Sequence, residues 1–165
     1  MEMPGLMKRF FPQPGRTLER RVHKRAVHYW WHARGERDAV ALADFDPLEI
    51  EDDFSHGFLL NLRAPDHPVL TYIGPVLAQE AGLDGDPVPL ASVADNSLLK
   101  RFANHYPRAL ASGEPETAEY EFVTFAGYHV LCRGSLLPLS ADGATLDHVY
   151  GVVSWKSEKL ANQAS

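Results

Sequence analysis

The side chains best suited to chemistry in this sequence are one cysteine, Cys132, and eight histidines. A lone cysteine excludes an intramolecular disulfide and a cysteine zinc cluster, and in the middle of a predicted strand it is typical of a small buried apolar residue. His28 and His32 stand four residues apart on a predicted helix, so both rings can reach one metal ion. No third ligand is identifiable near them. This favours solvated or partner-facing histidines, and we expect no metal site.

Clustered carboxylates are a second candidate for metal chemistry. Residues 36–56 are rich in acidic side chains: Glu36, Asp38, Asp44, Asp46, Glu49, Glu51, Asp52 and Asp53. Hard cations take oxygen ligands, but the spacing lacks the alternating Asp/Asn pattern with a distal glutamate that builds a calcium loop. We expect these carboxylates to be solvated.

Motifs for catalysis and phosphate binding are missing from the sequence. Ser135, Ser140 and Ser154 lie outside any Gly-x-Ser-x-Gly elbow, and no motif pairs a nucleophile with a base. The glycine-rich stretch at 82–86 is not followed by the Lys-Ser/Thr pair of a phosphate-binding loop. The chain is therefore predicted not to be an enzyme.

Charge is distributed unevenly along the chain. Residues 1–25 hold seven basic and two acidic side chains, a net charge of +5, whereas the remainder carries −11. Such an arm either contacts an anionic surface or pairs with the acidic body. Apolar side chains between residues 6 and 11 suit a membrane surface or a partner groove, but the stripe is too short to be stable alone. The acidic body argues against binding of nucleic acid.

The compartment is predicted from what the chain lacks. No apolar run approaches the roughly 18 residues that span a bilayer, and the N-terminus lacks the pattern of a secretory signal. One cysteine demands no oxidising environment. We expect a cytoplasmic protein.

A long helix is predicted for residues 17–34, with Thr17 as N-cap and Gly35 as the left-handed C-terminal residue. Apolar residues recur along it at three- and four-residue steps, and Val27 and Trp31 widen the apolar arc. We therefore expect the helix to pack on the outer face of a sheet and to help form a homodimer, with Val153 and Trp155 supplying the facing surface. The dimer or partner candidates are Val22, Tyr29, Trp30, Trp31 and Trp155.

Five strands are predicted from short alternating apolar segments bounded by turn residues: 57–62, 69–73, 118–125, 128–139 and 146–156. Between the second and third, residues 76–81 and 97–110 have helical spacing, and Pro107 should bend the latter or begin a new turn. A five-stranded antiparallel sheet with a helical insertion is α+β. The absence of alternating β-α units disfavours a dinucleotide-binding fold.

This order of elements resembles the PAS fold, in which the helical insertion and one sheet face enclose a small cavity. Over about residues 28–156 the chain is similar to a bacterial subgroup of short, stand-alone PAS proteins. The similarity is carried by Tyr29-Trp30, Arg34-Gly35, Arg37, Asp44, Asp46-Pro47, Ile50, Phe58-Leu59-Leu60, the segments 70–74 and 81–85, Tyr106, Gly113, Pro115 and the hairpin 136–143. The predicted organisation is an arm at 1–16, a helix at 17–35, a PAS domain at 36–156 and a tail at 157–165.

The resemblance implies a cytoplasmic signalling or regulatory module that senses a small metabolite or contacts a signalling protein. A ligand-free dimerisation or adaptor domain is the alternative. The sequence does not indicate which face of the last two strands lines the cavity, because both faces carry apolar residues. The cavity candidates are Tyr72, Phe102, Tyr106, Tyr128, Val130 and Cys132.

No cofactor is expected. Flavin-binding light sensors of this superfamily need a reactive cysteine on the helix before the third strand, whereas Cys132 lies in a predicted strand. Haem-binding members place an axial histidine on that helix, where His105 stands. His105 is offset from the face that Phe102 and Tyr106 share, which favours a solvated or hydrogen-bonded histidine.

Overall fold

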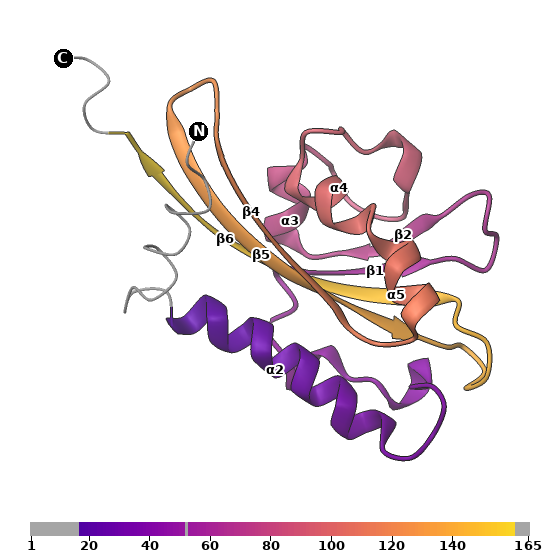
Figure 1. Ribbon diagram of the computed structural model, residues 1–165. Helices are drawn as coiled ribbons and strands as arrows, with labels where there is room; N and C mark the ends of the chain where they lie inside the picture. Colours follow the sequence, from indigo (N-terminus) through magenta and orange to yellow (C-terminus); the bar gives the residue numbers. More distant parts are fainter. Residues whose placement is uncertain (1–16, 52, 161–165) are drawn as a thin grey trace.

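The computed structural model describes residues 17–51 and 53–160 (Figure 1). The predicted arm at 1–16 and most of the predicted tail lie outside these residues. The described chain folds around one antiparallel sheet. A long helix crosses one face of this sheet, and a group of short helices covers the other.

The sheet has six strands in the order β3-β2-β1-β6-β5-β4, so the first strands of the chain lie beside the last. Five of them correspond to the predicted strands, with β4 beginning and ending two residues earlier than predicted, and the architecture is the predicted α+β arrangement of an antiparallel sheet with a helical insertion. The additional β3 is a two-residue edge strand beside the start of β2, too short to show an alternating pattern. The strands are β1 (Gly57–Asn61), β2 (Val69–Ile73), β3 (Val88–Pro89), β4 (Glu116–Val123), β5 (Tyr128–Leu139) and β6 (His148–Lys159).

Strands β5 and β6 form the longest hairpin. They pair from Tyr128 opposite Lys159 to Leu139 opposite His148. The last strand therefore continues beyond the predicted end at 156, because each of its final residues has a partner on β5. Its start is later than predicted, since Asp142 organises a longer loop between the two strands by accepting amide hydrogen bonds from Ala144 and Thr145.

The helical insertion lies between β2 and β4. It contains α3 (Pro75–Glu80), η4 (Leu90–Ser92), α4 (Leu98–Ala103) and α5 (Tyr106–Ser112). The helix predicted at 97–110 is thus divided, and Pro107 stands in the first turn of α5, where its missing amide costs nothing. Ser97 caps α4, and Gly113, at φ +70°, ends α5. We call the sheet face beneath these helices the inner face.

Helix α2 (Thr17–Arg34) packs on the opposite, outer face, as predicted (Figure 1). Trp30 anchors it: the side chain is fully buried and its indole nitrogen donates to the Pro138 carbonyl at 2.8 Å. Gly35, at φ +56°, ends the helix as predicted. The connecting segment 36–56, with η2 (Leu42–Asp44) and η3 (Pro47–Glu49), then returns across the outer face and buries Phe45 and Ile50 there.

Candidate functional site

The predicted cavity residues do not line one cavity. Cys132 and Val130 point to the inner face, where Phe102 and Tyr106 also lie, so the even-numbered side chains of β5 face the insertion. Tyr72 lies on the other side of the sheet, among residues of the outer face.

Tyr128, the sixth candidate, stands at the far end of β5, where its side chain is 40% exposed. The expectation that all six residues line one cavity is therefore wrong. A sheet separates its alternate side chains onto two faces, and the sequence did not reveal which residues share a face.

The space between the insertion and the inner face is filled by the protein's own side chains. The Phe102 ring packs directly on Gly134, so that a Cβ at position 134 would lie 2.6 Å from the ring. Phe58 packs on Gly151 in the same way. The hollow left between α5 and strands β4 and β5 has about 10 Å³, room for about one water. Small-molecule sites usually take about 300–1,000 Å³, so this hollow holds no ligand of that size without movement of the helices.

His105 is held by a neighbouring tyrosine. Its Nε2 shares a hydrogen bond with the Tyr120 hydroxyl, and the two rings stack with 5.9 Å between their centroids. Burial, and then the nearby Arg108, lower the pKa of His105. Tyr120 in turn contacts the Phe102 ring edge-on. An axial haem ligand needs open space beside it, and the filled inner space does not fit a haem.

Cys132 lies on β5 and is 1% exposed. Its thiol donates to the Tyr120 carbonyl at 3.6 Å, and burial raises its pKa to about 12. A protonated, enclosed thiol is a weak nucleophile. Neither its position nor its protonation fits flavin photochemistry.

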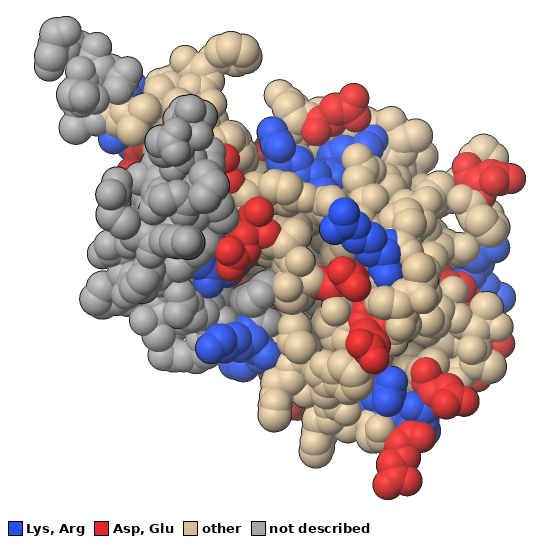
Figure 2. Space-filling view, in the orientation of Figure 1, with Lys and Arg blue, Asp and Glu red and all other residues tan. Residues whose placement is uncertain are grey.

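The remaining histidine and carboxylate candidates lie at the surface. His28 and His32 are exposed on α2 and line one shallow pocket together with Glu49 of the acidic segment. Asp44 of the same segment pairs with Arg37 at 2.8 Å. Within residues 17–51 and 53–160, no three His, Cys, Asp or Glu side chains are grouped so that they could hold a metal ion. Acidic and basic side chains are interspersed over the face shown in Figure 2, without one continuous basic patch.

The predicted contact residues of α2 differ in accessibility. Trp30 is fully buried, whereas Trp31 is 40% exposed and has the Arg34 guanidinium 5.1 Å above its ring. Tyr29 and Val22 are partly buried against the outer-face core.

Trp155 and Val153 lie on the inner face, away from α2. The expectation that they face α2 is wrong, because the neighbouring residues Val152 and Ser154 occupy the outer face of β6. A shift of one residue in a strand moves a side chain to the other side of the sheet.

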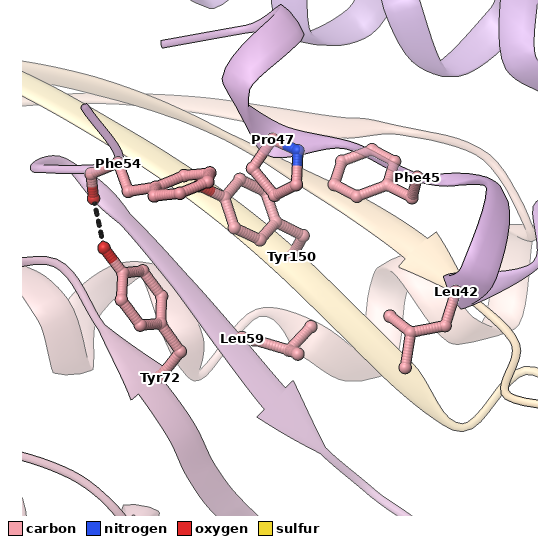
Figure 3. Close-up of a pocket in the computed structure, with 7 residues that line it drawn as sticks. All are labelled: Leu42, Phe45, Pro47, Phe54, Leu59, Tyr72 and Tyr150. Atoms are coloured by element: carbon pink, nitrogen blue, oxygen red, sulfur yellow. Dashed lines mark hydrogen bonds between the residues drawn. The ribbon is translucent and has the colours of Figure 1, made fainter. Parts of the chain in front are cut away.

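A pocket on the outer face was missed by sequence reasoning. It has a volume of about 320 Å³ and lies between the connecting segment and strands β1, β2 and β6 (Figure 3). Of its lining residues only Tyr72 was a predicted cavity residue, because the pocket brings together residues far apart in the sequence. Its lining residues are Leu42, Phe45, Pro47, Phe54, Leu59, Tyr72 and Tyr150.

Hydrogen bonds fix the two tyrosines of this outer pocket. The Tyr72 hydroxyl donates to the Phe54 carbonyl at 2.9 Å (Figure 3), and the Tyr150 hydroxyl donates to Glu51 Oε2 at 2.7 Å. Burial and the adjacent Glu51 raise the pKa of Tyr150. A Cβ at Gly57 would lie 1.9 Å from the Tyr150 hydroxyl oxygen, so glycine is required beneath this pair.

None of the helices in the described part of the chain has the length and hydropathy needed to traverse a bilayer. No family model matches the chain, and no curated protein matches it.

Two solved structures are similar to part of this chain at low identity. One is a variant of the fungal photoreceptor VVD, at a TM-score of 0.42 and 14% identity, covering 64% of this chain and 79% of that one. The other is an RNA-binding light-oxygen-voltage receptor, at a TM-score of 0.40 and 21% identity, covering 66% of this chain and 32% of the receptor. This chain therefore spans about a third of the receptor. At these TM-scores, the similarities carry no argument about the fold or the function of this chain.

Proposed function

We propose that this chain is a non-enzymatic regulatory module with a PAS-type fold, and that it acts in the cytoplasm by contacting a signalling protein. The observation that carries the proposal is the filled inner space, where about 10 Å³ remains beside Phe102 and Gly134. A domain whose interior is occupied by its own side chains transmits information through its surface. This favours the ligand-free alternative over a sensor that holds a metabolite between its helices and its sheet.

The proposed contact element is the N-terminal helix, residues 17–35, and the proposed PAS unit begins at residue 36. Trp31 supports this assignment, because a tryptophan that is 40% exposed on an otherwise docked helix leaves apolar surface for a second molecule. Trp30 is buried against the sheet, and the Tyr29 hydroxyl accepts a hydrogen bond from the Asp46 amide. These two residues are therefore not available to a partner, and the apolar surface that α2 can offer is narrower than its sequence suggests. We infer that a homodimer forms through this narrower surface.

The hairpin between β4 and β5 offers a competing surface. Phe125 is fully exposed at its tip, with the exposed side chains of Val123 and Tyr128 nearby. The two surfaces are distinguished by placing one charge in each.

Light scattering after size exclusion at tens of micromolar tests the proposal. We expect the wild-type chain to have the mass of a dimer, Trp31→Glu to have the mass of a monomer, and Phe125→Glu to remain a dimer. Thermal melts of each variant report whether the fold persists. A wild-type chain with the mass of a monomer would refute the proposed dimer. Loss of the dimer only in Phe125→Glu would show that the interface lies on the β4–β5 hairpin instead of α2.

A further inference from the structure

The outer pocket has the walls of an aromatic cage. Four of its lining residues are aromatic: Phe45, Phe54, Tyr72 and Tyr150. Figure 3 shows the rings of Phe54, Tyr150 and Phe45 in a row, with Tyr72 below Phe54 and hydrogen-bonded to its backbone carbonyl. The volume of about 320 Å³ lies at the small end of the range for ligand sites. The pocket therefore suits a compact group rather than a large cofactor.

The rings keep defined positions. Phe45 lies between Tyr29 and Tyr150, with centroid distances of 5.4 and 5.3 Å, and Phe54 meets Tyr72 edge-on at 5.9 Å. Phe54 has a φ of +63°, which is rare for a bulky residue. Strained backbone at a site is typical of a ligand-binding position, and here it directs an aromatic side chain to the pocket.

Hydrogen bonding in the pocket excludes an anionic ligand. Both tyrosine hydroxyls already donate their protons, Tyr72 to the Phe54 carbonyl and Tyr150 to Glu51. Their oxygens can therefore accept hydrogen bonds but have no proton left to donate. None of the lining residues is basic. A carboxylate or phosphate would therefore find no charged or side-chain donor among the lining residues, which is costly.

The charges around the pocket favour a cation. Glu51 lies directly behind Tyr150, is 6% exposed, and accepts that hydroxyl. After burial, which is the main cause, Glu51, Asp86 and Asp53 raise the pKa of Tyr72. Two of these carboxylates are placed by hydrogen bonds next to the lining tyrosines: Glu51 accepts the Tyr150 hydroxyl, and Asp86 accepts the amide of Ile73, the residue after Tyr72. The faces of aromatic rings are themselves negative and attract cations, most strongly when the cation is desolvated.

We propose that the outer pocket binds a small alkylated ammonium cation, with its methyl groups against the partly exposed rings of Phe54 and Tyr72 and with the buried rings of Phe45 and Tyr150 forming the floor. Alkylation matters because a bare ammonium would lose its hydrating water and find few acceptors, whereas a trimethylammonium group needs only ring faces and nearby negative charge. Such a site lies on the opposite side of the sheet from the filled inner space. It is independent of the proposed dimer.

Isothermal titration calorimetry of the intact chain tests the proposal with two probes of the same shape. Choline carries the trimethylammonium cation, and 3,3-dimethylbutan-1-ol is its neutral carbon isostere. We expect choline to bind and the isostere to bind at least about tenfold more weakly. Equal affinities, or no heat with choline at millimolar concentration, would overturn the proposal.

Variants place the binding site. Tyr72→Leu removes one ring and should weaken choline binding at least about fivefold, whereas Tyr72→Phe keeps the ring and should stay within about twofold of wild type. Leu48→Ala, at a half-exposed residue that does not line the pocket, is the matched control. Thermal melts confirm that each variant is folded. Unchanged binding in folded Tyr72→Leu would show that the cation binds elsewhere and would refute the assignment.

Discussion

Trp30 anchors α2 on the sheet, and its replacement is the sharpest test of the packing. The side chain is 0% exposed and its indole donates to the Pro138 carbonyl. A buried aromatic residue removes about 150–250 Å² from water, worth about 4–6 kcal/mol as an upper bound at ~25 cal/mol per Å². Truncations of buried aromatic residues cost about 3–5 kcal/mol. We therefore expect Trp30→Ala to lower the free energy of unfolding by about 3–5 kcal/mol.

A second variant separates the hydrogen bond from the apolar contact. Trp30→Phe keeps a ring in the site but leaves the Pro138 carbonyl buried without its donor, which costs about 1–3 kcal/mol. The next residue is the matched control. Trp31 has the same chemistry but is 40% exposed, so Trp31→Ala should cost less than about 1 kcal/mol.

Urea titrations followed by far-UV circular dichroism measure these differences at one fixed protein concentration at which light scattering shows only monomer, since association through Trp31 would stabilise the folded state by mass action. The slopes of the transitions should agree among the variants, so that the midpoints report stability. Similar losses for the Trp30 and Trp31 variants, or a loss below about 1 kcal/mol in Trp30→Ala, would refute the reasoning. Either result would mean that α2 does not hold the position described.

Three further predictions concern single side chains. Iodoacetamide at pH 8 should modify Cys132 at least about a hundredfold more slowly in the native protein than in urea, because burial raises the thiol pKa to about 12; similar rates would contradict its enclosure. Gly134→Ala should destabilise the fold by about 1–3 kcal/mol in the same urea assay, because the new methyl group meets Phe102, whereas Gly85→Ala, with open space around it, should not; equal effects would contradict the filled inner space. Asp142 accepts two amides, which lower its pKa from 3.8 to about 2, so its stabilising contribution should be full above pH 3.8 and lost as the pH falls toward 2; an NMR titration midpoint near 3.8 would contradict this.

The strands and their order along the chain were predictable because the sequence patterns that indicate them are local. Alternation over 57–62 and 69–73, with turn residues between them, needs no knowledge of the rest of the chain. The same holds for the helix that ends before Gly35 and for the new turn at Pro107. The edge strand β3 was missed because a two-residue pairing leaves no pattern.

The faces of the sheet were less predictable. Both sides of β5 and β6 are apolar, so alternation alone did not assign them, and Trp155 was placed on the wrong side. The face that packs against the insertion is determined by Gly134 and Gly151, which leave room there for the rings of Phe102 and Phe58. The sequence shows these glycines but does not show which ring covers each one.

The outer pocket depends on contacts over long separations. Tyr150 and Glu51 are 99 residues apart, and their hydrogen bond forms only when the connecting segment returns across the last strand. Glu51 was predicted to be one of several solvated carboxylates. Its burial follows from the tertiary fold, and no period or motif in the connecting segment indicates it.

The filled inner space is tested most directly by native mass spectrometry of the freshly purified chain. We predict species at integer multiples of the 18.4 kDa chain mass, with the dimer predominant and no retained mass of flavin or haem size. A stoichiometric increment of that size would contradict the account, because no such molecule fits beside Phe102 and Cys132 unless the insertion helices move away from the sheet.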